Sequence, residues 1–130
     1  FSLGIADSVT VLARCAAEAD AAATMIANAV NLPGHPGIRR QPARDLQPDS
    51  DLGARLVVTA VPSLSADETA IALDAGAAQA QGLLARGLIA GAALFLQGQG
   101  RVVGAHVAQG IQQEEVAHAQ GRGAQAAACA

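Results

Sequence analysis

The sequence predicts an α+β fold in which helices pack on one face of a mixed β-sheet. Two β-branched apolar runs alternate with two Ala-rich stretches of helical length, and two short apolar segments joined by a Gly-containing turn follow them. Hydrophobic residues make up 52% of the 130-residue chain, but only 2% of its residues are aromatic. The chain can therefore bury one domain core, which must be aliphatic and built from small side chains.

The first strand and the first helix are predicted from one continuous stretch. Val9, Thr10 and Val11 begin a short β-branched run that is typical of a strand. The Ala-rich segment 16–30 follows, and Ala is the strongest helix former. Either Asn28 or Asn31 can cap the end of this helix, and Asn31, which stands before Leu-Pro-Gly, is well placed to do so.

A connecting region is expected over residues 32–53, because it holds four of the five prolines and shows no apolar period. Within it, His35 is the side chain best suited to acid–base chemistry near neutral pH, and the pair Arg39-Arg40 can meet a phosphate or a carboxylate. The plainer alternatives are a solvated loop histidine and a solvent-facing charge pair. Residues 55–61 then predict a second strand, which a proline ends.

A long helix is predicted over residues 66–86. Ser65, just before this helix, and Glu68, in its first turn, form a capping-box pattern. In this pattern the Ser65 hydroxyl accepts a backbone N–H and the Glu68 carboxylate reaches back to the N-cap. Gly76 and Gly82 inside the helix indicate close packing against the sheet, since glycine otherwise destabilises a helix. The side chains expected on its buried face are Ile71, Ala75, Ala78 and Leu83.

The last predicted element is a hairpin formed by residues 88–97 and 101–103 around Gly98-Gln99-Gly100. After this hairpin the apolar periodicity fades, and residues 105–130 are rich in Gln, Ala and Gly. We therefore expect one domain over residues 1–104, followed by a flexible tail.

Charge and hydropathy exclude several classes of partner. The net charge is −3, and the arginines are scattered among acids without the basic stripe of a nucleic-acid binder. No charged segment followed by an apolar core marks a signal peptide. The longest apolar stretches, such as 88–96, are far shorter than the roughly 20 residues of a membrane span. We expect a cytoplasmic protein with no nucleic-acid or membrane partner, and the sequence leaves its oligomeric state open.

The candidate metal ligands are Asp20 and Thr24, which lie four residues apart on the first predicted helix. At this spacing a carboxylate and a hydroxyl lie one above the other on the same helix face. Mg²⁺ prefers such hard oxygen ligands, usually one or two carboxylates together with water and substrate phosphates. Asn28, four residues further on, extends the same polar stripe. The alternative is a solvated helix face that binds nothing.

The residues around this pair carry a family resemblance. Asp20-Ala-Ala-Ala-Thr24, placed about ten residues after the predicted strand, resembles the strand and D-A-x-[AS]-T helix of the ApbE-type flavin transferases. The runs Phe1 to Thr10 and Ile26 to Val30 look closer still to an uncharacterised family related to those enzymes. The resemblance covers residues 1–104 and implies the C-terminal half of an ApbE-like, T-fold-like domain.

This resemblance implies a Mg²⁺-dependent site for the flavin nucleotide FAD. Asp20 and Thr24 would hold the metal against the FAD pyrophosphate, while Asp7 and Asn28 would belong to the cofactor-binding site. The implied reaction is transfer of FMN to a protein threonine or hydrolysis of FAD, in which bound metal neutralises developing charge. For Asp7, the alternative is a turn residue that bonds to neighbouring backbone.

The chain also departs from these enzymes. The His-x-x-[DN]-P segment that usually precedes their Val-Thr-Val strand is replaced here by the run Phe1 to Asp7. Because the chain begins at Phe1 inside an ordered-looking segment, we expect a fragment whose missing N-terminal half supplies the Gly-rich flavin contacts. Three interpretations remain: a flavin transferase, a relative that binds a nucleotide without transferring it, and a non-catalytic structural relative.

Overall fold

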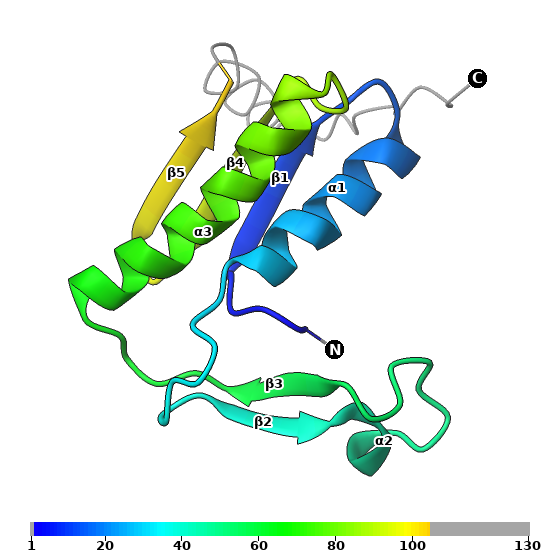
Figure 1. The fold of residues 1–130 in the computed structure, drawn as a ribbon, viewed down its shortest axis with the longest axis vertical. Coiled ribbons are helices and arrows are strands. Elements are labelled where there is room, and N and C mark those ends of the chain that lie inside the picture. Colours follow the sequence, from blue (N-terminus) through cyan, green and yellow to red (C-terminus); the bar gives the residue numbers. More distant parts are fainter. Residues whose placement is uncertain (1, 105–130) are drawn as a thin grey trace, which may run out of the picture.

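The computed structural model describes residues 2–104 of the chain, which contain helices and strands and confirm the predicted α+β class. The expected flexible tail, residues 105–130, lies outside the described residues. In chain order the elements are β1 (Ser8–Leu12), α1 (Ala16–Ala29), β2 (Arg39–Pro42), α2 (Ala43–Leu46), β3 (Leu56–Ala60), α3 (Ala66–Ala85), β4 (Gly91–Leu96) and β5 (Gln99–Val103) (Figure 1).

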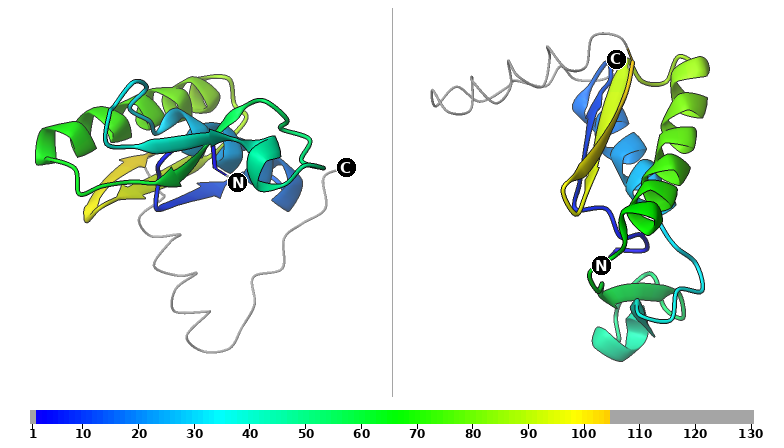
Figure 2. Two further views of the ribbon diagram at one scale, coloured as in Figure 1. Left: turned by 90° about the horizontal axis from the view of Figure 1, so that it is seen from below. Right: turned by 90° about the vertical axis from the view of Figure 1, so that its left-hand side faces the viewer.

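Helices α1 and α3 cover one face of a three-stranded sheet, as the sequence predicts (Figures 1 and 2). The strand order is β1-β4-β5, and both neighbouring pairs are antiparallel. The described strands therefore form no mixed sheet, in contrast to the prediction. A parallel pair needs a crossover connection between two strands of one sheet, but β2 and β3, the strands that follow α1, pair with each other instead.

Strands β2 and β3 form a separate antiparallel hairpin beyond one end of the helices, and α2 lies between them in sequence (Figure 1). The pairing runs from Arg39 with Ala60 to Pro42 with Leu56. The prediction of a connecting loop is wrong for β2 and α2. Proline is tolerated in an edge strand, so Pro42 did not exclude a strand here.

The main core lies between the three-stranded sheet and the two helices, where Leu73 of α3 and Leu94 of β4 are fully buried. At Gly76 the helix comes so close to its neighbours that an added Cβ would lie 2.3 Å from Val30 Cγ2 and 2.7 Å from Leu94 Cδ2. Gly82 has no such neighbour within 4 Å. The predicted close packing is thus confirmed at Gly76 and wrong at Gly82.

The buried face of α3 differs from the predicted one. Leu83 is buried as predicted, but Ile71 is 61% exposed, and Ala75 and Ala78 are also exposed. Two helices that share a sheet only three strands wide must lie close together, so α3 turns small side chains toward α1. The observed buried face consists of Thr69, Ala72, Leu73, Gly76, Ala80 and Leu83.

The hairpin of β4 and β5 is confirmed, although its turn differs from the predicted one. The two connecting residues are Gln97 and Gly98, whose φ angles of 44° and 83° are both positive, as in a type I′ turn. Glycine adopts this conformation without strain, and the twist of such a turn matches that of the two strands.

The outer sheet face, which points away from the helices, carries no charged side chain among the described strand residues. Side chains alternate along a strand. The residues whose side chains point away from the side of buried Leu94 therefore share this face. Phe95 and Val102 remain 44% and 54% exposed there. The complete set on this face is Ser8, Thr10, Leu12, Gly91, Ala93, Phe95, Gly100 and Val102.

Candidate functional site

The two candidate metal ligands lie one turn apart on α1, and both are exposed. The Thr24 hydroxyl donates to the Asp20 carbonyl oxygen at 3.1 Å, which directs the threonine side chain back toward the aspartate. Within residues 2–104, the Asp20 carboxylate takes part in no hydrogen bond or ion pair. This turn therefore presents a carboxylate and a hydroxyl oxygen to solvent.

Asn28 lies half-buried in the last turn of α1. It is eight residues beyond Asp20, a distance of about 12 Å along the helix axis. Helix α1 returns antiparallel to β1, so Asn28 lies toward the end of the sheet where β1 begins (Figure 1).

Asp7 lies just before β1 and contacts the β4–β5 turn. Its backbone N–H donates to the Phe95 carbonyl oxygen at 2.9 Å, and its carboxylate Oδ2 accepts the Gln97 N–H at 2.7 Å. The carboxylate thus stabilises the residue with a positive φ in that turn. In the part of the chain that is described, no three His, Cys, Asp or Glu side chains gather as a metal-binding group. Three of the four candidates, Asp20, Thr24 and Asn28, lie on α1, and Asp7 lies just before β1.

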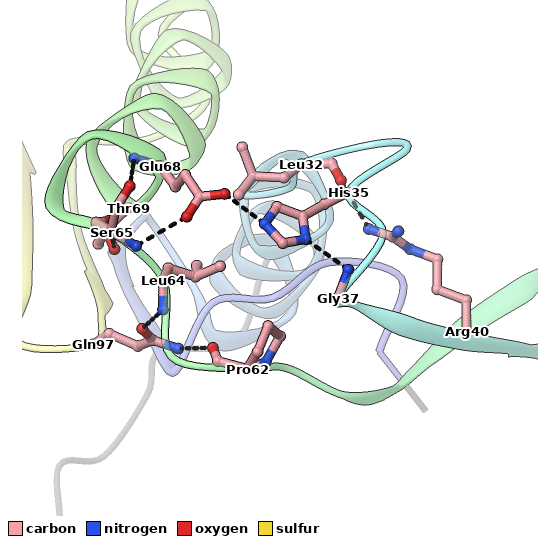
Figure 3. Close-up of polar contacts among 10 residues, drawn as sticks. All are labelled: Leu32, His35, Gly37, Arg40, Pro62, Leu64, Ser65, Glu68, Thr69 and Gln97. Carbon is pink, nitrogen blue, oxygen red and sulfur yellow. Dashed lines mark hydrogen bonds and ion pairs between the residues drawn. The ribbon is translucent and has the colours of Figure 1, made fainter.

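A second polar group lies where the β2–β3 hairpin meets the helices (Figure 3). We call this group the polar junction and define it by His35, Gly37, Ser65, Glu68 and Gln97. The predicted capping box is present, because Ser65 Oγ accepts the Glu68 N–H at 3.1 Å and Glu68 Oε1 accepts the Ser65 N–H at 2.9 Å. The second carboxylate oxygen of Glu68 contacts His35 Nε2 at 2.5 Å.

His35 belongs to the polar junction and is not the solvated loop histidine of the plainer alternative, since only 19% of its side chain is exposed. Its Nδ1 accepts the Gly37 N–H at 3.0 Å. A backbone N–H can only donate, so Nδ1 carries no proton and Nε2 is the nitrogen that donates to Glu68. Both ring nitrogens are occupied, which leaves the ring without a free lone pair for base catalysis.

Glu68 is held in its ionised form. Its pKa lies below the ordinary value because the Ser65 backbone N–H, and next His35, donate hydrogen bonds to the carboxylate; partial desolvation acts in the opposite direction. The junction therefore carries a negative charge at neutral pH, directly beside the His35 ring.

Gln97 links the segment before α3 to the β4–β5 turn. Its side-chain Oε1 accepts the Leu64 N–H, and its Nε2 donates to the Pro62 carbonyl oxygen, both at 2.8 Å (Figure 3). Together with Asp7, this glutamine joins three segments that are far apart in sequence. Because these partners lie 33 to 90 residues away, no local pattern indicated them.

Asn31 does not cap α1 as predicted, because the C-cap is Val30. The Asn31 side chain instead accepts the Leu32 N–H at 2.9 Å and a guanidinium N–H of Arg40 at 2.7 Å. Asn31 thus holds the start of the connector in place and binds Arg40 of β2. Arg40 is one of the two arginines predicted to meet an anion, and in the structure it donates to this asparagine.

A model of the protein family described as AbpE bacteria matches residues 1–102 of the chain. The chain belongs to this family. The match includes all elements from β1 to β4 and ends inside β5, so Asp7, the α1 pair and the polar junction all lie within the AbpE match. No curated protein and no solved structure matches the chain.

Within the AbpE match, sequence reasoning found the α1 pair and the capping box, but it missed the contacts of the capping box with His35. The one available signal was the combination of a capping-box glutamate with a histidine between two Pro-Gly turns. No helix in residues 2–104 is long and apolar enough to cross a membrane.

Proposed function

We propose that this AbpE-family chain contributes to a Mg²⁺-dependent site for a flavin nucleotide, with FAD as the ligand. The observation that carries the proposal is the exposed turn of α1 on which Asp20 and Thr24 present their oxygens together. The resemblance of this turn to the metal-binding helix of ApbE-type flavin transferases supports FAD as the nucleotide. Membership of the wider ApbE-like superfamily is part of the same proposal.

The donor set on this turn fits Mg²⁺. Asp20 supplies a carboxylate that no other described residue neutralises, and Thr24 supplies a hydroxyl whose own hydrogen is engaged by the Asp20 carbonyl oxygen. The lone pairs of the hydroxyl therefore stay available. Mg²⁺ needs only one or two protein carboxylates, because water and phosphate oxygens complete its coordination. When bound, the metal supplies charge neutralisation for the pyrophosphate.

The reaction that we propose for this site is transfer of FMN to a protein threonine or hydrolysis of FAD. In this scheme Asp20 and Thr24 bind and orient the metal–phosphate group, and Asn28, in the last turn of the same helix, lies beside the nucleotide. Asp7 is proposed to stand near the nucleotide while it keeps its hydrogen bond to the Gln97 N–H.

A second candidate is a relative that binds a nucleotide, or serves a structural role, without transfer. The packing of residues 2–7 supports this second candidate. Gly4 packs against α1 so tightly that an added Cβ would lie 2.0 Å from the Ala27 carbonyl oxygen, and Ile5 is buried. The segment that replaces the His-x-x-[DN]-P motif therefore holds the fold together, and its Asp7 is engaged by the turn.

The proposal is tested by calorimetric titration of FAD into the protein with and without Mg²⁺. We expect Mg²⁺-dependent binding that is weakened by about tenfold or more in Asp20→Asn, as for groups that support a bound metal. The matched control is Asp67→Asn, which removes another exposed acid, from α3.

Binding that is independent of Mg²⁺, or equally strong in both variants, would exclude the metal role of Asp20. If binding follows the expected pattern but no FMN transfer or FAD hydrolysis is detected, the second candidate holds.

A further inference from the structure

We propose that His35 is a pH-sensitive latch between the β2–β3 hairpin and the N-terminus of α3. This inference concerns a conformational device and is independent of the flavin site. It rests on the hydrogen bonds, packing and charges of the polar junction.

The latch spans the two chain segments that connect the hairpin to the helices. One connector runs from the end of α1 to β2 and contains His35; the other runs from β3 to α3 and ends at Ser65. His35 on the first connector bonds to Glu68, in the first turn after the second connector (Figure 3). This side-chain contact therefore links the two connectors at the base of the hairpin.

The hydrogen bonds of the ring require its neutral form. Nδ1 accepts from Gly37 while Nε2 donates to Glu68. A second proton can only add to Nδ1, where its N–H would face the Gly37 N–H across 3.0 Å. Two donors cannot bond to each other, so protonation breaks the bond to Gly37. The same proton turns the contact with Glu68 into a full ion pair.

Gly37 packs against both the His35 ring and the second connector. An added Cβ at Gly37 would lie 3.0 Å from Pro62 Cγ and 3.1 Å from His35 Cε1. Gly37 itself is exposed to solvent, so the ring and Pro62 of the second connector contact it on one side only. When the bond to Gly37 is lost, the segment that leads into β2 is no longer tied to the ring and gains freedom to move.

The charged side chains around the ring also favour its movement toward Glu68 on protonation. Among the residues drawn in Figure 3, Glu68 on α3 and Arg40 on β2 carry charge. Arg40 donates to the Leu32 carbonyl oxygen, which also accepts the His35 backbone N–H. A charged imidazole is attracted by the carboxylate and repelled by the guanidinium. Protonation of His35 therefore strengthens its contact with Glu68 on α3 and adds repulsion from Arg40 on β2.

The experiment is an NMR titration of the uniformly ¹⁵N-labelled full chain between about pH 8 and about pH 5, the range in which histidine changes charge. Ring ¹⁵N shifts report the protonation of His35, and amide exchange reports the Gly37 hydrogen bond. We expect the Gly37 protection factor to fall by about fivefold to tenfold with the same midpoint as the ring. The Ser65 amide, bonded to Glu68, should keep its protection.

The decisive variant is His35→Asn. Its side-chain carbonyl can still accept the Gly37 N–H, as in an Asx turn, but it does not titrate in this range. We expect Gly37 to stay protected at all pH values in this variant and to respond as in the parent in the control His118→Asn. Loss of Gly37 protection at low pH in His35→Asn, or a protected Gly37 beside a doubly protonated ring, would overturn the latch. A ring that stays neutral down to about pH 5 would overturn it as well.

Discussion

At the scale of single residues, what a glycine does in α3 depends on which face of the helix it occupies. Gly76 faces Val30 and Leu94, whereas Gly82 faces open space. We predict that Gly76→Ala destabilises the protein by about 1–3 kcal/mol, since the added methyl overpacks the core. Gly82→Ala should stabilise it by about 0.5–1 kcal/mol through helix propensity. Urea unfolding of both variants measures these changes.

The two variants serve as each other's control, because the chemical change and the helix are the same. If Gly76→Ala were as stable as Gly82→Ala, the close approach of α3 to α1 and β4 would be wrong.

The sequence predicted close packing at both glycines because the residue type alone does not tell which face of the helix a glycine occupies. Asp20 and Thr24 were more accessible to prediction, since their relation depends only on the helical period. Nothing local indicated that Asp7 would bond to Gln97, which lies 90 residues away. Single residues were thus predictable where their neighbours lie within one turn of helix.

At the scale of elements, the capping box makes the start of α3 sensitive to pH. The pKa of Glu68 is lowered in the folded protein relative to its ordinary value of 4.5. Its contribution to stability is therefore fully present above pH 4.5 and is lost as the pH falls through the lowered value. We predict that Glu68→Gln is less stable than the parent at neutral pH and that the difference shrinks on acidification below pH 4.5. Chemical denaturation at about pH 7 and about pH 3 checks this.

Asp67→Asn provides the control, because Asp67 is in the same helical turn and makes no side-chain hydrogen bond within residues 2–104. An equal loss in both variants at neutral pH would show that charge near the helix terminus matters and that the specific bonds of Glu68 do not.

Elements with a clear local signal were predicted, and strand β2, which has no such signal, was not. The β-branched run of β1, the capping box of α3 and the β4–β5 hairpin all carry local signals. Strand β2, in contrast, holds two arginines and a proline and forms only through pairing with β3. The separate location of the β2–β3 hairpin was unpredictable for the same reason, since no local pattern states which strand pairs with which.

At the scale of the whole molecule, we predict that the β2–β3 hairpin opens at a lower free energy than the main layer. Its buried apolar side chains outside the main core are few, chiefly Ala43 and Val57, whereas the core between the sheet and α1 and α3 is continuous. Native-state hydrogen exchange in low denaturant should show that the Val57 amide exchanges with a lower free energy of opening than the Leu94 amide.

The N-terminal segment opposes this opening, because the Ser2 carbonyl oxygen accepts the Val58 N–H at 2.8 Å. Identical opening free energies for Val57 and Leu94 would mean that hairpin and layer unfold as one cooperative unit.

The outer sheet face has a consequence for how the protein behaves in concentrated solution. Two copies that meet through Phe95 and Val102 hide apolar surface without removing any charge from water. A net charge of −3 provides little repulsion, and dissolved salt screens what there is. Contact between two copies through this face would therefore grow stronger as sulfate or phosphate is added, whereas contact held by ion pairs would grow weaker.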